Sequence, residues 1–167
     1  MPVLESGAKY HCIGAPSNGV DEVQTLTIGG TPTGGTFKLG FGGEVTADIT
    51  WSATNNTLVA NIDAALEALS NIGANEVTTA VGTMTAGIGT ITITFAGNLG
   101  KLNVPTITVE DNSLTGTLPT AAMTVTTPGV TATARGAALG ETVMDTASGK
   151  TYINNGSTTA PRWIEIG

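Results

Sequence analysis

Alternating apolar and polar residues predict β-strands over the first two thirds of the chain. The stretch EVQTLTI (22–28) alternates, and so does TFKLGF (36–41). The second stretch places Phe37, Leu39 and Phe41 on one face, because successive side chains of a strand point to opposite sides. The segment between the two stretches, GGTPTGG, predicts a turn, since glycine and proline favour turn conformations.

Similar patterns continue after this pair of strands. Gly42 and Gly43 predict a hairpin turn. The residues after it, EVTADITW (44–51), alternate again and put these apolar side chains on one face: Val45, Ala47, Ile49 and Trp51. Four later strands are predicted at NEVTTAV (75–81), GTITITF (89–95), VPTITVE (104–110) and AAMTVTT (121–127).

One segment repeats its apolar residues at helical spacing instead. The repeating residues are Leu58, Ile62, Leu66 and Leu69. This spacing predicts a helix over about 57–71, with a cap at Thr54, Asn55 or Asn56 and an end at Gly73. The apolar stripe of such a helix has to cover a sheet.

Residues 21–128 therefore predict about seven strands and one helix. Many short strands separated by Gly and Pro turns are typical of a β-sandwich or a barrel-like domain. The predicted fold class is mainly β, with a sandwich or barrel-like domain that carries one α-helix.

The two ends of the chain differ from this central domain. Residues 1–20 predict an N-terminal arm, either a loose terminus or an arm that orders on a neighbouring subunit. Residues 129–138 are rich in Gly, Ala and Thr and predict a linker. Residues 139–167 predict a small C-terminal β-meander. A sheet of this size is marginal alone, so it needs a partner surface, either residues 21–128 or another subunit.

Composition and charge exclude several classes of function. The chain has 167 residues, with 31 threonines and 23 glycines, and only 11% of its residues are charged. The net charge is −7 with six basic residues, which argues against a nucleic-acid binder that neutralises phosphates. No apolar run reaches the roughly 18–20 residues of a membrane helix. The first residues lack a basic region followed by an apolar one, so no secretory signal is expected.

Candidate catalytic and metal-binding groups are few. His11 and Cys12 are the only residues of their kinds, and neighbours in an extended chain point to opposite sides. One His and one Cys cannot make a zinc site. The glycine clusters match no phosphate-binding loop. The carboxylates at 21–22 and 110–111 form no EF-hand loop and are interpreted as solvated, with a bound Ca²⁺ as the alternative. We expect a non-enzymatic protein without metal or cofactor.

Two stretches resemble known structural proteins. Residues 22–109 combine VQTLTIGG, a glycine-separated hairpin, ALEALSNIG and a late FAGNLGKLNVP. This combination resembles a β-rich module of tailed-bacteriophage structural proteins and large bacterial surface proteins. Residues 140–167, with DTASGKTYINNG and PRWIEIG, resemble a short C-terminal β element of phage head and fibre proteins.

The resemblance implies a virion protein, foremost a capsid decoration protein. Such a protein is made in the host cytoplasm, binds the major capsid protein on the outer capsid surface, stabilises contacts between capsomers and often forms a homotrimer. The alternatives are a phage tail or fibre component, and a bacterial surface adhesin or carbohydrate-binding module. We expect neither nucleic-acid nor membrane partners.

Five residues near the chain ends are candidates for the interface. They are Tyr10, His11, Tyr152, Trp163 and Ile164. For Trp163 two roles stay open, a core residue of the meander and an interface anchor. Trp51 lies on an alternating apolar face and is interpreted as a core residue.

Overall fold

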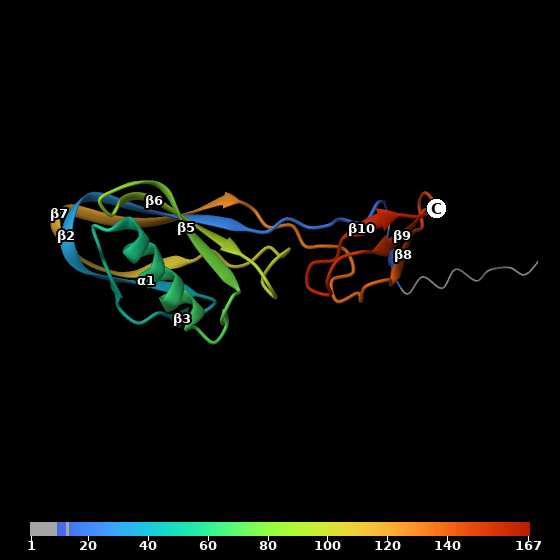
Figure 1. Cartoon of the computed structure of the whole chain (residues 1–167), viewed down its shortest axis with the longest axis horizontal. Helices are drawn as coiled ribbons and strands as arrows, with labels where there is room; N and C mark the ends of the chain where they lie inside the picture. Colours follow the sequence, from blue (N-terminus) through green and yellow to red (C-terminus); the bar gives the residue numbers. More distant parts are fainter. Residues whose placement is uncertain (1–9, 13) are drawn as a thin grey trace, which may run out of the picture.

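The computed structural model describes residues 10–12 and 14–167, with the backbone alone for Tyr10 and His11. The part of the predicted arm before Tyr10 lies outside the described residues. The chain forms a six-stranded sheet with one helix, and a separate four-stranded sheet (Figure 1). The elements are β1 (Tyr10–Cys12), β2 (Val23–Phe41), β3 (Glu44–Val45), β4 (Ile49–Thr50), α1 (Asn55–Glu67), β5 (Val77–Thr85), β6 (Ile88–Phe95), β7 (Thr108–Thr127), β8 (Thr142–Asp145), β9 (Thr151–Asn154) and β10 (Trp163–Glu165).

The long antiparallel pair of β2 and β7 is the frame of the large sheet. The pairing runs from Val23 opposite Thr127 to Gly40 opposite Thr108, with several register shifts on the way. The predicted turn at GGTPTGG is therefore wrong, because the strand continues through it. The end of the strand predicted at 104–110 and the whole of the one predicted at 121–127 likewise belong to the single strand β7, whereas residues 104–107 form no strand.

Glycine explains why β2 bends here without ending. Gly30 and Gly35 have φ angles of 71° and 90°, which L side chains rarely adopt. A Cβ atom on Gly30 would lie 2.0 Å from the carbonyl oxygen of Leu118, and one on Gly35 would lie 2.3 Å from that of Ser113. The glycines thus let two backbones approach closely at bulges while the ladder continues.

The bend brings the two halves of β2 to opposite sides of one core. β6 pairs with residues 23–28 of β2, whereas β4 and β3 pair with its second half. In Figure 1 the β2–β7 ribbon curls at the far left, with α1 beside it. The core includes Leu26, Ile28, Phe37, Leu39, Ile49, Leu58, Ile62, Leu66, Ile91, Ile93 and Phe95. The predicted mainly β fold with one helix is confirmed.

The helix is shorter at its end than its apolar pattern predicts. It spans Asn55–Glu67, and the following residues form a tight turn that closes when the Gly73 N–H donates to the Leu69 carbonyl. Leu69 is still buried, so the apolar stripe extends past the helix into this turn. Thr54 is the N-cap, but its side chain makes no capping bond. The side chain of Asn55 instead bonds Met84 and Gly87 in the β5–β6 hairpin.

The prediction of one strand over residues 44–51 is wrong in part. Gly42 and Gly43 form the predicted hairpin turn, but β3 and β4 are separate short strands. Thr46 lies between them and is buried, and its hydroxyl accepts a hydrogen bond from the Leu39 N–H at 3.1 Å. This reversal turns Val45 outward, where it is 50% exposed.

Two buried polar residues hold the loop between β6 and β7. The Glu22 carboxylate accepts hydrogen bonds from the Gln24 side chain, from the Val104 N–H at 3.0 Å and from the Gly129 N–H at 3.3 Å. Gln24 in turn accepts from the Ile107 N–H at 2.7 Å. These bonds satisfy backbone groups that a buried loop would otherwise leave unpaired.

The small sheet combines β1 with the last three strands of the chain. Its strand order is β1-β8-β9-β10, and β1 pairs in parallel with β8. Its interior consists of Ala137, Val143, Tyr152 and Trp163, with Cys12 and Ala134 beside them. The meander therefore packs against the N-terminal segment and the linker of the same chain, which neither predicted partner surface included, and contact with another subunit stays a prediction.

Two segments of the chain, residues 14–20 and 129–137, run together between the two sheets and are called the neck. Val20 and Val130 exchange backbone hydrogen bonds of 2.9 and 3.0 Å, and the Thr133 N–H donates to the Ser17 carbonyl. Figure 1 shows the two segments side by side between the sheets. No helix in the described part of the chain is long and apolar enough to cross a membrane.

Replacing Leu66 with alanine tests the role of the helix. Leu66 is fully buried, so we expect the variant to lose about 2–5 kcal/mol in the free energy of unfolding. Leu118→Ala is the control, because Leu118 is 83% exposed and its loss should cost less than about 0.5 kcal/mol. Urea unfolding measures both, and equal stability of the two variants would contradict the packing described here.

Candidate functional site

The long outer strands of the large sheet are β5 and β7, and the two-residue strands β3 and β4 are outer strands as well. Residues of an antiparallel strand bond alternately to its two sides. The Phe95 N–H donates to the Glu22 carbonyl, and the Ala96 N–H donates to the Glu76 carbonyl. Phe95 thus bonds towards β2 and Ala96 towards β5, and the pairing registers carry this alternation to the outer strands. The N–H and C=O groups of Thr79 therefore point away from β6, and those of Met123 point away from β2.

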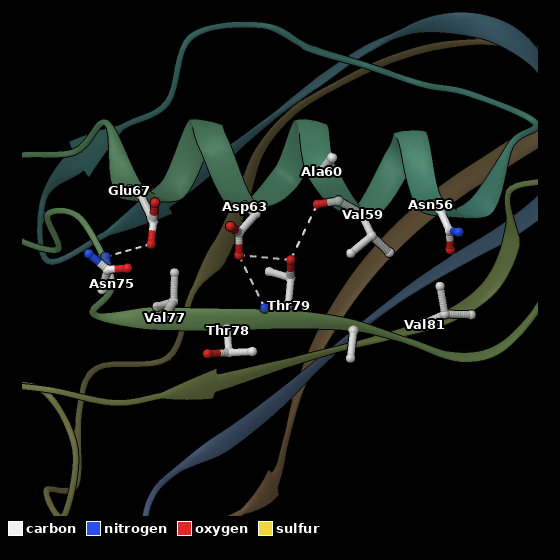
Figure 2. Close-up of a pocket in the computed structure, with 11 residues that line it drawn as sticks. Asn56, Val59, Ala60, Asp63, Glu67, Asn75, Val77, Thr78, Thr79 and Val81 are labelled. Carbon is white, nitrogen blue, oxygen red and sulfur yellow. Dashed lines mark hydrogen bonds between the residues drawn. The ribbon is translucent and has the colours of Figure 1, made fainter.

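Helix α1 covers the outer edge of β5. The Asp63 carboxylate accepts hydrogen bonds from the Thr79 N–H at 3.1 Å and from the Thr79 hydroxyl at 2.9 Å (Figure 2). The Glu67 carboxylate accepts one from the Asn75 N–H at 2.6 Å. The helix thus fills the place that another strand would take beside β5.

An open groove of about 680 Å³ follows this contact between α1 and β5. Figure 2 shows Val77 and Val59 on the side of the groove with Glu67 and Asp63, and Val81 near Asn56 at its other end. Both carboxylates already bind backbone N–H groups of the same chain. These hydrogen bonds hold α1 against β5, so we assign the two carboxylates a structural role.

The outer edge of β7 has no such cover. Residues 113–127 contain no charged side chain, and most of them are exposed. Among the described residues, no side chain donates to or accepts from the outward backbone groups of Ala121, Met123 and Val125. A long, uncharged edge is a template for pairing with another strand.

The small sheet holds the five candidate interface residues. Tyr152 and Trp163 are buried in its interior, so Trp163 has the position of a core residue, whereas Ile164 is 40% exposed. The Trp163 ring N–H donates to the Thr133 carbonyl at 2.9 Å. The backbones of Tyr10 and His11 pair with β8, and their side chains lie outside the described residues.

One carboxylate links the segment after β1 to the turn between β8 and β9. Asp145 accepts hydrogen bonds from the Ser148 hydroxyl at 2.5 Å, from the Ala147 N–H at 2.9 Å and from the Gly14 N–H at 2.7 Å. These bonds, the one from Ser148 above all, hold the pKa of Asp145 below its usual value. Burial and the nearby Asp145 charge raise the pKa of the Cys12 thiol, which favours its protonated, unreactive form.

The carboxylates at 21–22 and 110–111 also have protein partners. Asp21 binds the Lys101 ammonium at 3.0 Å, and Glu22 is buried in the loop network. Asp111 accepts from the Ser113 hydroxyl at 2.9 Å. In the part of the chain that the structure describes, no three His, Cys, Asp or Glu side chains gather as a metal site would require.

No protein-family model matches the chain, and no curated protein matches it. Among solved structures, a chain from Mycobacterium phage Patience is similar over 87% of this chain, with 20% sequence identity and a TM-score of 0.43. The match covers 49% of that phage chain, so this protein spans about half of its length. One structural neighbour is thus a phage protein, and a likeness at this level carries no argument about function.

Removing the Asp63 carboxylate should weaken the closed edge of the sheet. Asp63→Ala leaves the Thr79 N–H without its acceptor, which we expect to cost about 1–3 kcal/mol and to promote association through β5. Asp63→Asn is the matched control, because its amide oxygen still accepts a hydrogen bond. Urea unfolding and light scattering measure the two effects. An alanine variant as stable and as soluble as the asparagine variant would show that the contact does not protect the edge.

Acid should loosen the join between the chain ends. The pKa of Asp145 is lowered in the folded protein, so its contribution to stability is present above the ordinary aspartate pKa of about 3.9 and is lost as the pH falls through the lowered value. We expect the amide NMR signals of Gly14 and Ala147 to shift together below about pH 4. In Asp145→Asn this shift should be absent. Signals that titrate alike in both proteins would mean that another group controls the join.

Proposed function

We propose that this protein is a non-enzymatic structural protein of a phage virion, a decoration protein that binds the outer capsid surface. The sequence resemblance to phage head and fibre proteins supports this role. The net charge of −7 also suits the outside of a capsid better than a DNA-lined interior. The resemblance further implies the major capsid protein as partner and self-association, with a trimer as the expected state.

The observation that carries the proposal is the apolar outer surface of the small sheet. Ile164 is 40% exposed and Ile166 is 55% exposed, and Ile164 lies opposite the half-buried Ile153 of β9 on the same face. Exposed apolar side chains that lie together are typical of protein-binding surfaces. In Figure 1 the small sheet lies at the end of the molecule remote from α1.

The neck supports the same assignment. It places the small sheet away from the large one, so that one sheet is able to rest on a capsid while the other projects. Both segments of the neck end in the small sheet, and the Trp163 N–H donates to the Asn18 side chain at 2.6 Å. A surface held by two chain segments resists pulling better than one on a single linker.

A tail or fibre component is the second candidate. The sequence resemblance to phage fibre proteins supports it, and tail proteins assemble with copies of themselves into rings and tubes. A tail-tube subunit should form such assemblies without a capsid, whereas a decoration protein needs the capsid lattice.

Co-sedimentation with undecorated capsids tests the proposal. The double variant Ile164→Lys with Ile166→Lys places two charges in the proposed contact, so we expect its capsid binding to fall by about tenfold or more. Val45→Lys is the control, since Val45 is 50% exposed but lies on the large sheet. Circular dichroism should show all proteins folded.

Three outcomes would overturn the assignment. They are absence of binding by the unaltered protein, equal binding by the double variant, and self-assembly into tubes without capsids. The last outcome would select the tail component instead.

A further inference from the structure

The last part of β7 is a regular and uncharged edge. Residues 120–125 pair with β2 without a register shift, opposite residues 24–29. In Figure 1 this part of β7 (orange) lies at the margin of the sheet, with β2 (blue) next to it. The nearest carboxylates of the strand, Glu110 and Asp111, lie beyond the bend near Gly116.

The two faces of this edge differ in chemistry. Ala121 and Met123 pack against the large core and are half-buried, and Val125 on the same face is 39% exposed. Ala122 and Thr124 lie on the opposite face and are exposed. The core of the large sheet is therefore incompletely covered along β7, since its last apolar row still meets water.

We propose that two copies of this chain join through β7, antiparallel and edge to edge, with Met123 facing Met123 of the second copy. The two large sheets then become one continuous sheet across a two-fold axis. This pairing is independent of capsid binding and stands or falls separately from the function proposed above.

The proposed register satisfies the backbone groups that are left open. Ala121, Met123 and Val125 direct their N–H and C=O groups outward, as the alternation along β2 and β6 requires. With Met123 on the axis, Ala121 faces Val125 of the second copy, and each such pair exchanges two hydrogen bonds. Pro119 is the next outward residue and has no N–H, so the ladder ends there.

The same register matches the side chains by type. Residues separated by an even number lie on one face of a strand, so apolar residues of the half-buried face meet apolar residues of the second copy. On the other face Ala122 meets Thr124 of the second copy. No charged side chain of β7 faces another across the axis, because Glu110 and Asp111 lie beyond the bend in both copies.

The pairing closes with two copies. A two-fold contact uses the same edge on both partners and leaves none for a third. The opposite edge of the sheet is covered by α1 and capped by Asp63. The proposed dimer thus differs from the trimer that the family resemblance implies, and a mass measurement separates the two.

Sedimentation velocity over a range of concentrations tests the dimer. We expect a species of twice the chain mass of 16.7 kDa. Met123→Lys places two ammonium groups opposite each other at the axis, which should raise the dissociation constant by about tenfold or more. Met84→Lys is the matched control, because Met84 is also half-buried against the large core but lies on β5. This control should remain a dimer.

Hydrogen exchange of the unaltered protein gives a second, independent readout. The amides of Ala121, Met123 and Val125 should exchange slowly at high protein concentration and faster on dilution. Those of Ala122 and Thr124, which bond to β2, should not respond to dilution. This readout decides the matter if Met123→Lys fails to fold.

Each of three results would overturn the proposal. The unaltered protein could sediment as a monomer at all concentrations, or as a trimer. Alternatively, the folded Met123→Lys variant could dimerise as tightly as Met84→Lys, which would place the contact elsewhere.

Discussion

The antiparallel pairing of β2 with β7 is the constraint on which the rest of the structure depends. It joins residues up to about a hundred positions apart in the sequence, and every other strand of the large sheet attaches directly or through β6 to β2. The bend in this pair creates the core, because it places Leu26 and Phe37 on facing walls of one interior. Helix α1 then closes the interior, and Glu22 and Gln24 hold the loop that leads into β7. Loss of the pairing would remove the core itself.

The second constraint is the meeting of the chain ends in one small sheet. A meander of β8–β10 alone would have few residues to bury, since strands this short rarely form a stable sheet. β1 adds a fourth strand, and Asp145 and Asn154 bond backbone groups of the turns and of the linker. The same arrangement forces residues 14–20 and 129–137 to run together as the neck. The pairing of β1 with β8 therefore produces both the small sheet and its connection to the large sheet by two segments of the chain.

Much of the fold was predictable because local patterns determine it. The buried faces of Phe37 and Leu39 and of Ile91 and Ile93 follow from alternation, and the stripe of α1 follows from helical spacing. The joined strands were not predictable from composition, because Gly30 and Gly35 serve bulges as readily as turns and only the β7 backbone distinguishes the two.

The candidate surfaces were predictable only in part. Ile164 has an exposed position, but the burial of Tyr152 and Trp163 depends on β1 and the linker, which lie far away in the sequence. The free edge of β7 had a signal in the uncharged run 113–127, yet a run of this kind also occurs in inner strands. Which strand lies at an edge is decided by long-range pairing. The hydrogen bonds from Thr79 of β5 to Asp63 of α1 likewise join residues that long-range packing brings together.

The two proposals rest on surfaces at different places, the apolar face of the small sheet for a capsid and the edge of β7 for a second copy. Electron cryo-microscopy of intact particles that contain the protein tests the central claim, which is attachment to a capsid through the small sheet. We expect density for the small sheet in contact with the outer capsid surface and for the large sheet projecting from it. Density in the tail, inside the capsid, or with the large sheet on the capsid and the small sheet free would contradict it.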